Sequence, residues 1–218
     1  MKSLILKDLY NIGHNAKSML FMLLVMSFII IPFSGAEAYI VMSDILCSMM
    51  VITTFSFDDN SKWMKYAMVT PITKKDMVTS KFIVLLIFSA IGAVVGLVIG
   101  SIGGIIVHKL NFSNISDIFT LLFVSLVSIV IAEIIGSISI PLLFKFGVEK
   151  ARMLTFVSLI IPAAICFGVY EILTLLGVSF SDQLIFILLC CSPLIALVWN
   201  LVMYQISYVI FAKKELLY

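Results

Sequence analysis

Six long apolar stretches occupy most of this 218-residue chain and leave only short polar segments between them. A membrane-spanning helix needs about 20 predominantly apolar residues, and most of the stretches reach that length. Hydrophobic residues make up 62% of the chain and charged residues 12%, whereas soluble domains carry roughly 45–50% and about 25%. A bilayer solvates such a surface and water does not. We therefore expect an all-α polytopic membrane protein with about six transmembrane helices, at Met19–Phe33, Ala38–Phe57, Lys81–Val107, Ile118–Phe144, Leu154–Leu176 and Gln183–Ala212.

The basic residues are distributed unevenly between the polar segments. Only Lys109 lies between the first and second, third and fourth, or fifth and sixth stretches. Lysine and arginine are enriched in short cytoplasmic segments of membrane proteins. The pattern predicts that both termini are cytoplasmic. The other basic residues all lie in the segments assigned to that side: Lys2, Lys7, Lys17, Lys62, Lys65, Lys74, Lys75, Lys81, Lys145, Lys150, Arg152, Lys213 and Lys214.

Residues 1–17 have the pattern of an amphipathic helix lying on the inner membrane surface. At 100° per residue one arc of this helix is apolar and the opposite arc is polar. The apolar arc contains Leu4, Ile5, Leu9, Ile12 and Ala16, and the polar arc contains Lys7, Asn11 and His14. Such a helix either anchors the chain at the membrane surface or forms an elbow that transmits the movement of a bound partner to the first span.

Residues 58–80 form the segment between the second and third predicted spans, and the charge pattern places this segment in the cytoplasm. Residues 58–60, Asp-Asp-Asn, can cap a short helix that runs from Lys62 to Ala67 and ends before Pro71. Thr73 and Asp76 have the spacing of a capping box for the next helix. We expect Trp63, Tyr66 and Ala67 to form an aromatic and apolar face ringed by lysines. This face either docks onto a soluble protein or anchors the segment at the lipid headgroups.

Three segments resemble one family along the chain. FDDNSKWMKY (residues 57–66), TPITKKDMV (residues 70–78) and Ser80-Lys81 resemble the loop after the second span of bacterial type-2 ABC transporter permeases. MKSLILKDLY (residues 1–10) is similar to the start of the same permeases. Within that family the chain looks most like the small permeases that export phenol-soluble modulins, which are amphipathic peptide toxins, and those of lantibiotic or bacitracin self-protection.

The resemblance implies a single permease domain over residues 1–218 in a bacterial cell membrane, paired with a second copy or a paralogue. It implies a coupling helix at Asp59–Thr70 that docks onto separate ABC ATPase subunits, which bind ATP and Mg. The ATPase-coupling residues would be Asp59, Lys62, Trp63, Lys65, Tyr66, Ala67 and Pro71. The cargo would be hydrophobic or amphipathic, for example a peptide toxin or an antimicrobial peptide, and it would leave the cell. No nucleic-acid partner is implied.

The chain itself lacks the G-x-x-x-x-G-K-[ST] sequence that holds nucleotide phosphates. We therefore expect no cofactor in this chain and no enzymatic activity of its own. An intramembrane metallohydrolase is disfavoured, because the two histidines, His14 and His108, are predicted on opposite faces of the membrane. A proton-coupled secondary transporter and a non-transporting membrane scaffold stay open as alternatives.

Several residues inside the apolar stretches are candidates for function. Asp44 and Glu133 are acidic, and an ionised side chain in the bilayer is costly. Glu171 is a third acid, unless Val169–Asp182 is a re-entrant or surface helix after a span that ends near Gly168. Glu133 either bonds to a neighbouring helix or faces a cargo path or dimer seam. Asp44 lies about 9 Å inside the outer boundary, where a water-facing or interface role suits it better. The glycines follow the small-xxx-small pattern of close helix packing and could instead form a pliable seam; they are Gly92, Gly96 and Gly100.

Overall fold

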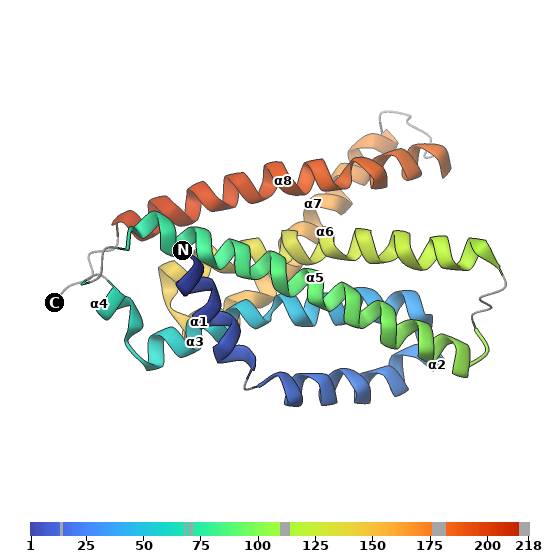
Figure 1. The fold of residues 1–218 in the computed structure, drawn as a ribbon. Coiled ribbons are helices and arrows are strands. Elements are labelled where there is room, and N and C mark those ends of the chain that lie inside the picture. Colours follow the sequence, from blue (N-terminus) through green and yellow to red (C-terminus); the bar gives the residue numbers. More distant parts are fainter. Residues whose placement is uncertain (14, 68, 70–71, 110–113, 176–181, 214–218) are drawn as a thin grey trace.

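The computed structural model describes residues 1–13, 15–67, 69, 72–109, 114–175 and 182–213. The regular elements in these ranges are α-helices (Figure 1), so the all-α expectation is confirmed. In chain order they are α1 (Lys2–Gly13), α2 (Ala16–Ser48), α3 (Met50–Asn60), α4 (Trp63–Ala67), α5 (Lys74–Ile106), α6 (Ile115–Phe146), α7 (Val148–Leu175) and α8 (Asp182–Lys213).

The helix α2 contains a reversal at Gly35. This residue has φ 90° and ψ 173°, a backbone conformation that glycine adopts without a steric penalty. The hydroxyl of Tyr39 donates a hydrogen bond to the carbonyl of Leu23 at 3.1 Å, although 16 residues of straight helix would separate them by about 24 Å. The two arms of α2 therefore lie side by side, and the second arm leads into α3 (Figure 1). The break falls between the first two predicted stretches.

Four helical segments among the described residues are long and apolar enough to cross a membrane: Ala16–Asn60, Lys74–Ile106, Ile115–Phe146 and Leu188–Lys213. A shorter apolar helix covers Ser158–Val169. The expected count of six is thus not confirmed by length and composition, and it stays a prediction. The helix α7 continues through Gly168 to Leu175, while residues 176–181 of the segment considered as re-entrant lie outside the described residues.

The second arm of α2 packs closely against α5 along the glycines. A Cβ atom on Gly92 would lie 2.7 Å from Cβ of Cys47 and 2.9 Å from Cα of Asp44. On Gly96 it would lie 2.1 Å from Oγ of Ser43. Close approach of backbones is how helices gain packing energy in lipid, where the hydrophobic effect supplies little. The glycines therefore serve packing inside one chain, and their role in a cargo path or dimer seam stays a prediction.

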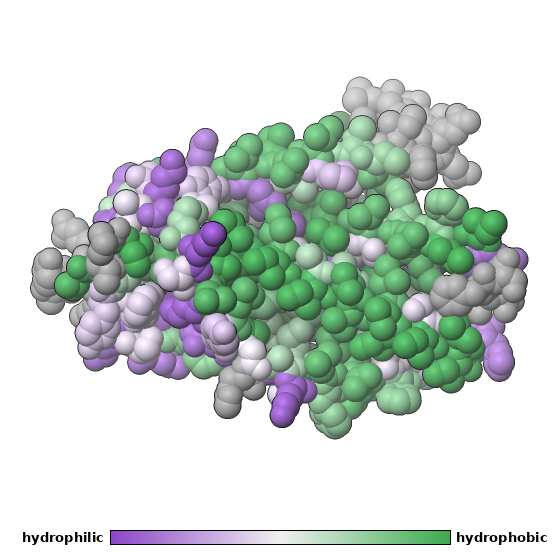
Figure 2. All heavy atoms as spheres, viewed as in Figure 1, coloured by the Kyte–Doolittle hydropathy of each residue, from purple (hydrophilic) through white to green (hydrophobic). Residues whose placement is uncertain are grey.

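One end of the bundle, the lysine-rich end, holds α1, α4, the starts of α5 and α7 and the ends of α3, α6 and α8 (Figure 1). Figure 2 shows hydrophilic residues gathered over this end and hydrophobic residues along the helices. Nζ of Lys74 donates to the Ala212 carbonyl at 2.9 Å, which joins α5 to α8 there. Lys109 lies elsewhere and donates to the Pro32 carbonyl at 2.6 Å. The assignment of the lysine-rich end to the cytoplasm stays a prediction from charge.

The main hydrophobic core also lies at the lysine-rich end. The ring of Phe144 on α6 packs against Phe55 of α3 and Phe211 of α8, with centroid separations of 4.9 and 4.7 Å. Leu4 and Ile12 of α1 and Ala67 of α4 belong to the same cluster of buried side chains. The two short helices are thus packed onto the bundle.

Gly92→Ala should destabilise the protein by about 1–3 kcal/mol, because the new methyl group overlaps Cys47 and the α2 backbone. Gly168→Ala is the matched control, since nothing lies within 4 Å of the position of its Cβ. Thermal unfolding in detergent followed by circular dichroism measures both. Equal stability of the two variants would contradict the close seam.

Candidate functional site

The short helix α4 presents two different sides. Ala67 is fully buried and Trp63 is half-buried against the main core. Tyr66 is 66% exposed, and Val69, just after the helix, is 86% exposed. The expectation of one face shared by Trp63, Tyr66 and Ala67 therefore does not describe α4: Trp63 faces the bundle and Tyr66 faces outward. Pro71 and the side chain of Lys65 lie outside what the structure describes.

Residues 58–60 do not cap α4. They form the last turn of α3, which ends at Asn60, and Lys62 with φ 52° turns the chain into α4. Acidic side chains at a helix C-terminus interact unfavourably with the helix dipole and need positive partners. The carboxylates find donors on other helices instead. Asp59 Oδ2 accepts a hydrogen bond from the backbone N–H of Val148, at the start of α7, at 3.3 Å. Of the predicted coupling helix Asp59–Thr70, the first two residues thus belong to α3 and Trp63–Ala67 form α4, while residues 68 and 70 lie outside the described residues.

The capping box at the start of α5 is confirmed. The side chain of Thr73 accepts a hydrogen bond from the backbone N–H of Asp76 at 3.1 Å. The carboxylate of Asp76 in turn accepts from the backbone N–H of Thr73 at 3.3 Å. Aspartate thus replaces the usual glutamate, and α5 begins at Lys74 as its local sequence indicates.

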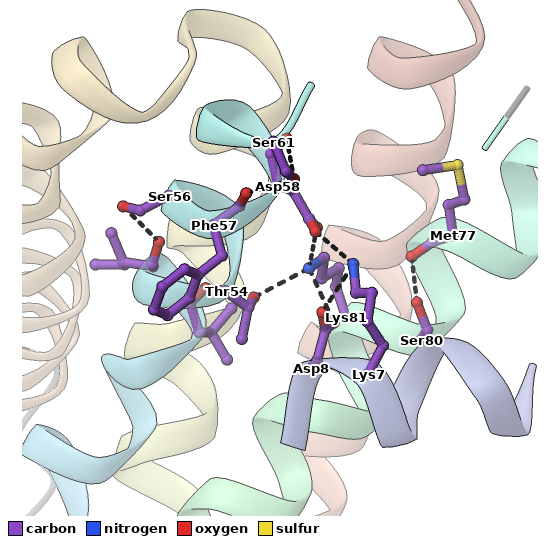
Figure 3. Close-up of polar contacts among 12 residues, drawn as sticks. Lys7, Asp8, Thr54, Ser56, Phe57, Asp58, Ser61, Met77, Ser80 and Lys81 are labelled. Carbon is purple, nitrogen blue, oxygen red and sulfur yellow. Dashed lines mark hydrogen bonds and ion pairs between the residues drawn. The ribbon is translucent and has the colours of Figure 1, made fainter. Parts of the chain in front are cut away.

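Four charged side chains from α1, α3 and α5 meet and form a closed ring, the ionic ring (Figure 3). Its Lys7 lies against Trp63 of α4. Nζ of Lys81 on α5 lies 2.9 Å from Asp8 of α1 and 2.6 Å from Asp58 of α3. Nζ of Lys7 pairs with the same two carboxylates, at 3.1 Å from Asp8 and in a short contact with Asp58. Lys81 also donates to Oγ1 of Thr54 at 3.1 Å, so its three N–H groups each have an acceptor.

Three members of the ionic ring are buried, with Lys81 4%, Asp8 1% and Asp58 2% exposed, whereas the side chain of Lys7 is 23% exposed. Desolvation of each charge is costly and is offset only when every partner is present. Two lysines and two aspartates give a ring without net charge. Lys7 and Lys81 lie over aromatic rings as well, at 4.8 Å from the centroid of Trp63 and 4.7 Å from that of Phe55. The ring therefore joins α1, α3 and α5, and Lys7 connects it to α4.

The ionic ring corrects the expected orientation of α1. Leu4 and Ile12 are buried as the apolar arc predicts, but they face the bundle, and Asp8 lies between them on the same side. Lys7, which was predicted on the polar arc, instead points toward Asp58 of α3. Sequence reasoning missed the ring, although Asp8 at helical spacing between Leu4 and Ile12 was a signal: a carboxylate on an apolar arc needs a buried partner.

The acids inside the apolar helices bond to hydroxyl and amide groups. Asp44 is fully buried and accepts a hydrogen bond from Ser128 of α6 at 2.8 Å. Glu133 is 7% exposed and accepts from Ser89 of α5 at 2.9 Å and from Asn200 of α8 at 3.1 Å. These bonds join helices within one chain, and a role in a cargo path or dimer seam stays a prediction. Glu171 is exposed on α7.

The comparison with protein families matches almost the whole chain. The model of the family described as ABC-2 family transporter protein covers residues 3–212. The chain belongs to the ABC-2 family of transporter proteins. Searches of curated proteins and of solved structures each give no match.

This ABC-2 permease is therefore the membrane component of an ABC transporter, and its helices make it a multi-pass membrane protein. The family places ATP hydrolysis in a separate subunit, so it implies an ABC ATPase as partner. The secondary-transporter and scaffold alternatives are accordingly disfavoured. Within the described residues, no group of three or more His, Cys, Asp or Glu side chains could hold a metal ion.

Lys81→Met should destabilise the permease by about 3–5 kcal/mol, because it leaves two buried carboxylates with only Lys7 as a positive partner. Lys17→Met removes a charge from an exposed position and should leave stability nearly unchanged. Denaturant unfolding of both variants in mixed micelles gives the difference. A Lys81→Met protein as stable as Lys17→Met would show that the ring contributes little.

Proposed function

We propose that the chain is the permease subunit of an ATP-driven exporter and that α4 docks onto the separate ATPase, with Tyr66 and Val69 as its outermost contacts. The observation that carries the proposal is the shape of α4. It is fastened to the bundle by Trp63 and Ala67 and presents Tyr66 and Val69 away from it. Tyrosine is enriched among the residues that contribute most to protein–protein binding, so an exposed tyrosine on a fixed base suits an interface anchor.

The position of α4 supports the same proposal. It lies at the lysine-rich end (Figure 1), which the charge rule assigns to the cytoplasm, where a soluble ATPase is available. An open hollow of about 480 Å³ lies beside the end of α3 and offers polar groups to a partner. It is lined by Ser56, Asp59, Asn60, Val148, Glu149 and Lys150.

We further propose that two permeases, identical or paralogous, pair in the membrane and move a hydrophobic or amphipathic cargo such as a peptide. Large apolar side chains are exposed on α2, α5, α6, α7 and α8, and lipid or a second permease would cover them. Nucleotide-driven closure of the two ATPases would then displace the α4 helices and rock the attached bundles. This cycle moves cargo without chemistry in the permease itself.

The double variant Tyr66→Ala/Val69→Ala should weaken binding of the partner ABC ATPase by at least about tenfold, because both outermost contacts are lost. Tyr10→Ala is the matched control: Tyr10 is 73% exposed at the same end of the bundle but belongs to α1. Binding is measured by co-purification and by biolayer interferometry in lipid nanodiscs. Undiminished binding of the double variant would remove α4 from the interface.

Glu133→Gln should reduce export more than it reduces stability if the carboxylate faces the cargo. Glutamine keeps one acceptor for Ser89 or Asn200, so the helix contacts are partly preserved. Release of a labelled amphipathic helical peptide from cells and the thermal midpoint of the purified protein are compared. A parallel loss of export and stability would assign Glu133 to helix packing alone.

A further inference from the structure

Within the described residues, the helix α4 contacts the rest of the chain at several identifiable points. Its sequence neighbour is the last turn of α3, Ala67 enters the core, and the Trp63 ring lies under the ammonium group of Lys7. Lys7 at the same time contacts Asp58 of α3 and Asp8 of α1. A displacement of α4 can therefore reach the bundle through Lys7 and the ionic ring, beside the paths through α3 and the main hydrophobic core.

The geometry of the ring resists separation of its helices. Three of its four ion pairs cross between helices: Lys7–Asp58 joins α1 to α3, Asp8–Lys81 joins α1 to α5, and Lys81–Asp58 joins α3 to α5. Any one of the three helices can leave only by breaking two ion pairs together. Departure of α3 would leave Asp58 without its ion pairs, and departure of α5 would do the same to Lys81; such unpaired buried charges are strongly disfavoured. Departure of α1 would remove one of the two ion-pair partners of Asp58 and of Lys81.

We infer that Lys7 and Lys81 are positioning residues that clamp α1, the end of α3 and the start of α5 into one rigid unit beneath α4. Lys7 is the link to α4 through Trp63, and Lys81 is the link to the long helix α5. Neither lysine needs to touch cargo or ATPase. The clamp makes α1 follow α4, so that both helices move as one body.

The helix α5 then carries the movement into the membrane. Lys81 lies two turns after the start of α5, and the glycines at 92, 96 and 100 that contact α2 lie about 16–28 Å farther along the same helix. A shift imposed on Lys81 therefore acts on the α2–α5 seam through a continuous rod. That the movement starts at α4 and passes into α5 rests on the proposed function of α4. The clamp between α1, α3 and α5 does not depend on that function.

The clamp is tested first on the permease alone in lipid nanodiscs, by electron–electron double resonance in a chain whose four cysteines are replaced by alanine. Spin labels at Tyr10→Cys on α1 and Tyr66→Cys on α4 report their separation; both sites are well exposed. A reference pair at Ile106→Cys on α5 and Ser116→Cys on α6 reports the opposite end of the bundle.

Lys7→Met should broaden the distance distribution of the α1–α4 pair and leave the reference pair unchanged. Lys7→Arg, which keeps the charge and the stacking on Trp63, should restore the narrow distribution. Lys2→Met removes an exposed charge from the same helix and should have no effect. An α1–α4 distribution that stays narrow in Lys7→Met overturns the clamp. Equal broadening of both pairs does so too, because it indicates general loosening.

The second measurement uses the permease assembled with its ATPase and trapped with ATP and vanadate. Two label pairs are measured in the parent: Lys62→Cys with Ser116→Cys, and Tyr10→Cys with Ser116→Cys. Trapping should change both distances in the same direction. In Lys7→Met the Lys62 shift should persist and the Tyr10 shift should be lost. Retention of both shifts overturns the inference. Absence of any Lys62 shift in the parent contradicts the proposed function instead, and the first measurement still decides the clamp.

Discussion

The ammonium group of Lys81 lies where α1, α3 and α5 meet, and the arrangement of the lysine-rich end depends on its three acceptors. Asp8, Asp58 and Thr54 each supply one oxygen. A buried lysine is costly unless it is fully paired, so the three helices that provide these oxygens are required to stay together. The orientation of α1 and the support beneath α4 both follow from this requirement.

The bundle is held together by different interactions along its apolar lengths and at its lysine-rich end. Along the apolar lengths the helices gain little from the hydrophobic effect, and close contact at Gly92 and Gly96 and hydrogen bonds to Asp44 and Glu133 join them. At the lysine-rich end an aromatic core around Phe144 packs beneath a ring of charges. The well-connected end is also the end that carries α4, which suits a part that receives force from another subunit.

Local signals predicted the features that depend on neighbours in sequence. The Thr73–Asp76 capping box, the short helix before Pro71 and the small-residue repeat at Gly92 and Gly96 were all readable in the chain, because each rests on spacing within one or two turns. The prediction that residues 58–60 cap α4 was wrong. Aspartates commonly cap helices, and nothing local showed that Lys81 and Val148 would supply partners that let α3 continue to Asn60.

The sequence by itself determined that this protein is a bundle of apolar helices, with most of its basic residues gathered at one end and a short helix among them. Those properties follow from hydropathy and from charge counted along the chain. Only the tertiary structure decided which side of α1 faces the bundle, that Trp63 turns inward while Tyr66 stays exposed, and that Lys7, Asp8, Asp58 and Lys81 form one ring. The physical reason is that a buried charge is stabilised by partners from other helices, and those partners become neighbours only when the helices pack.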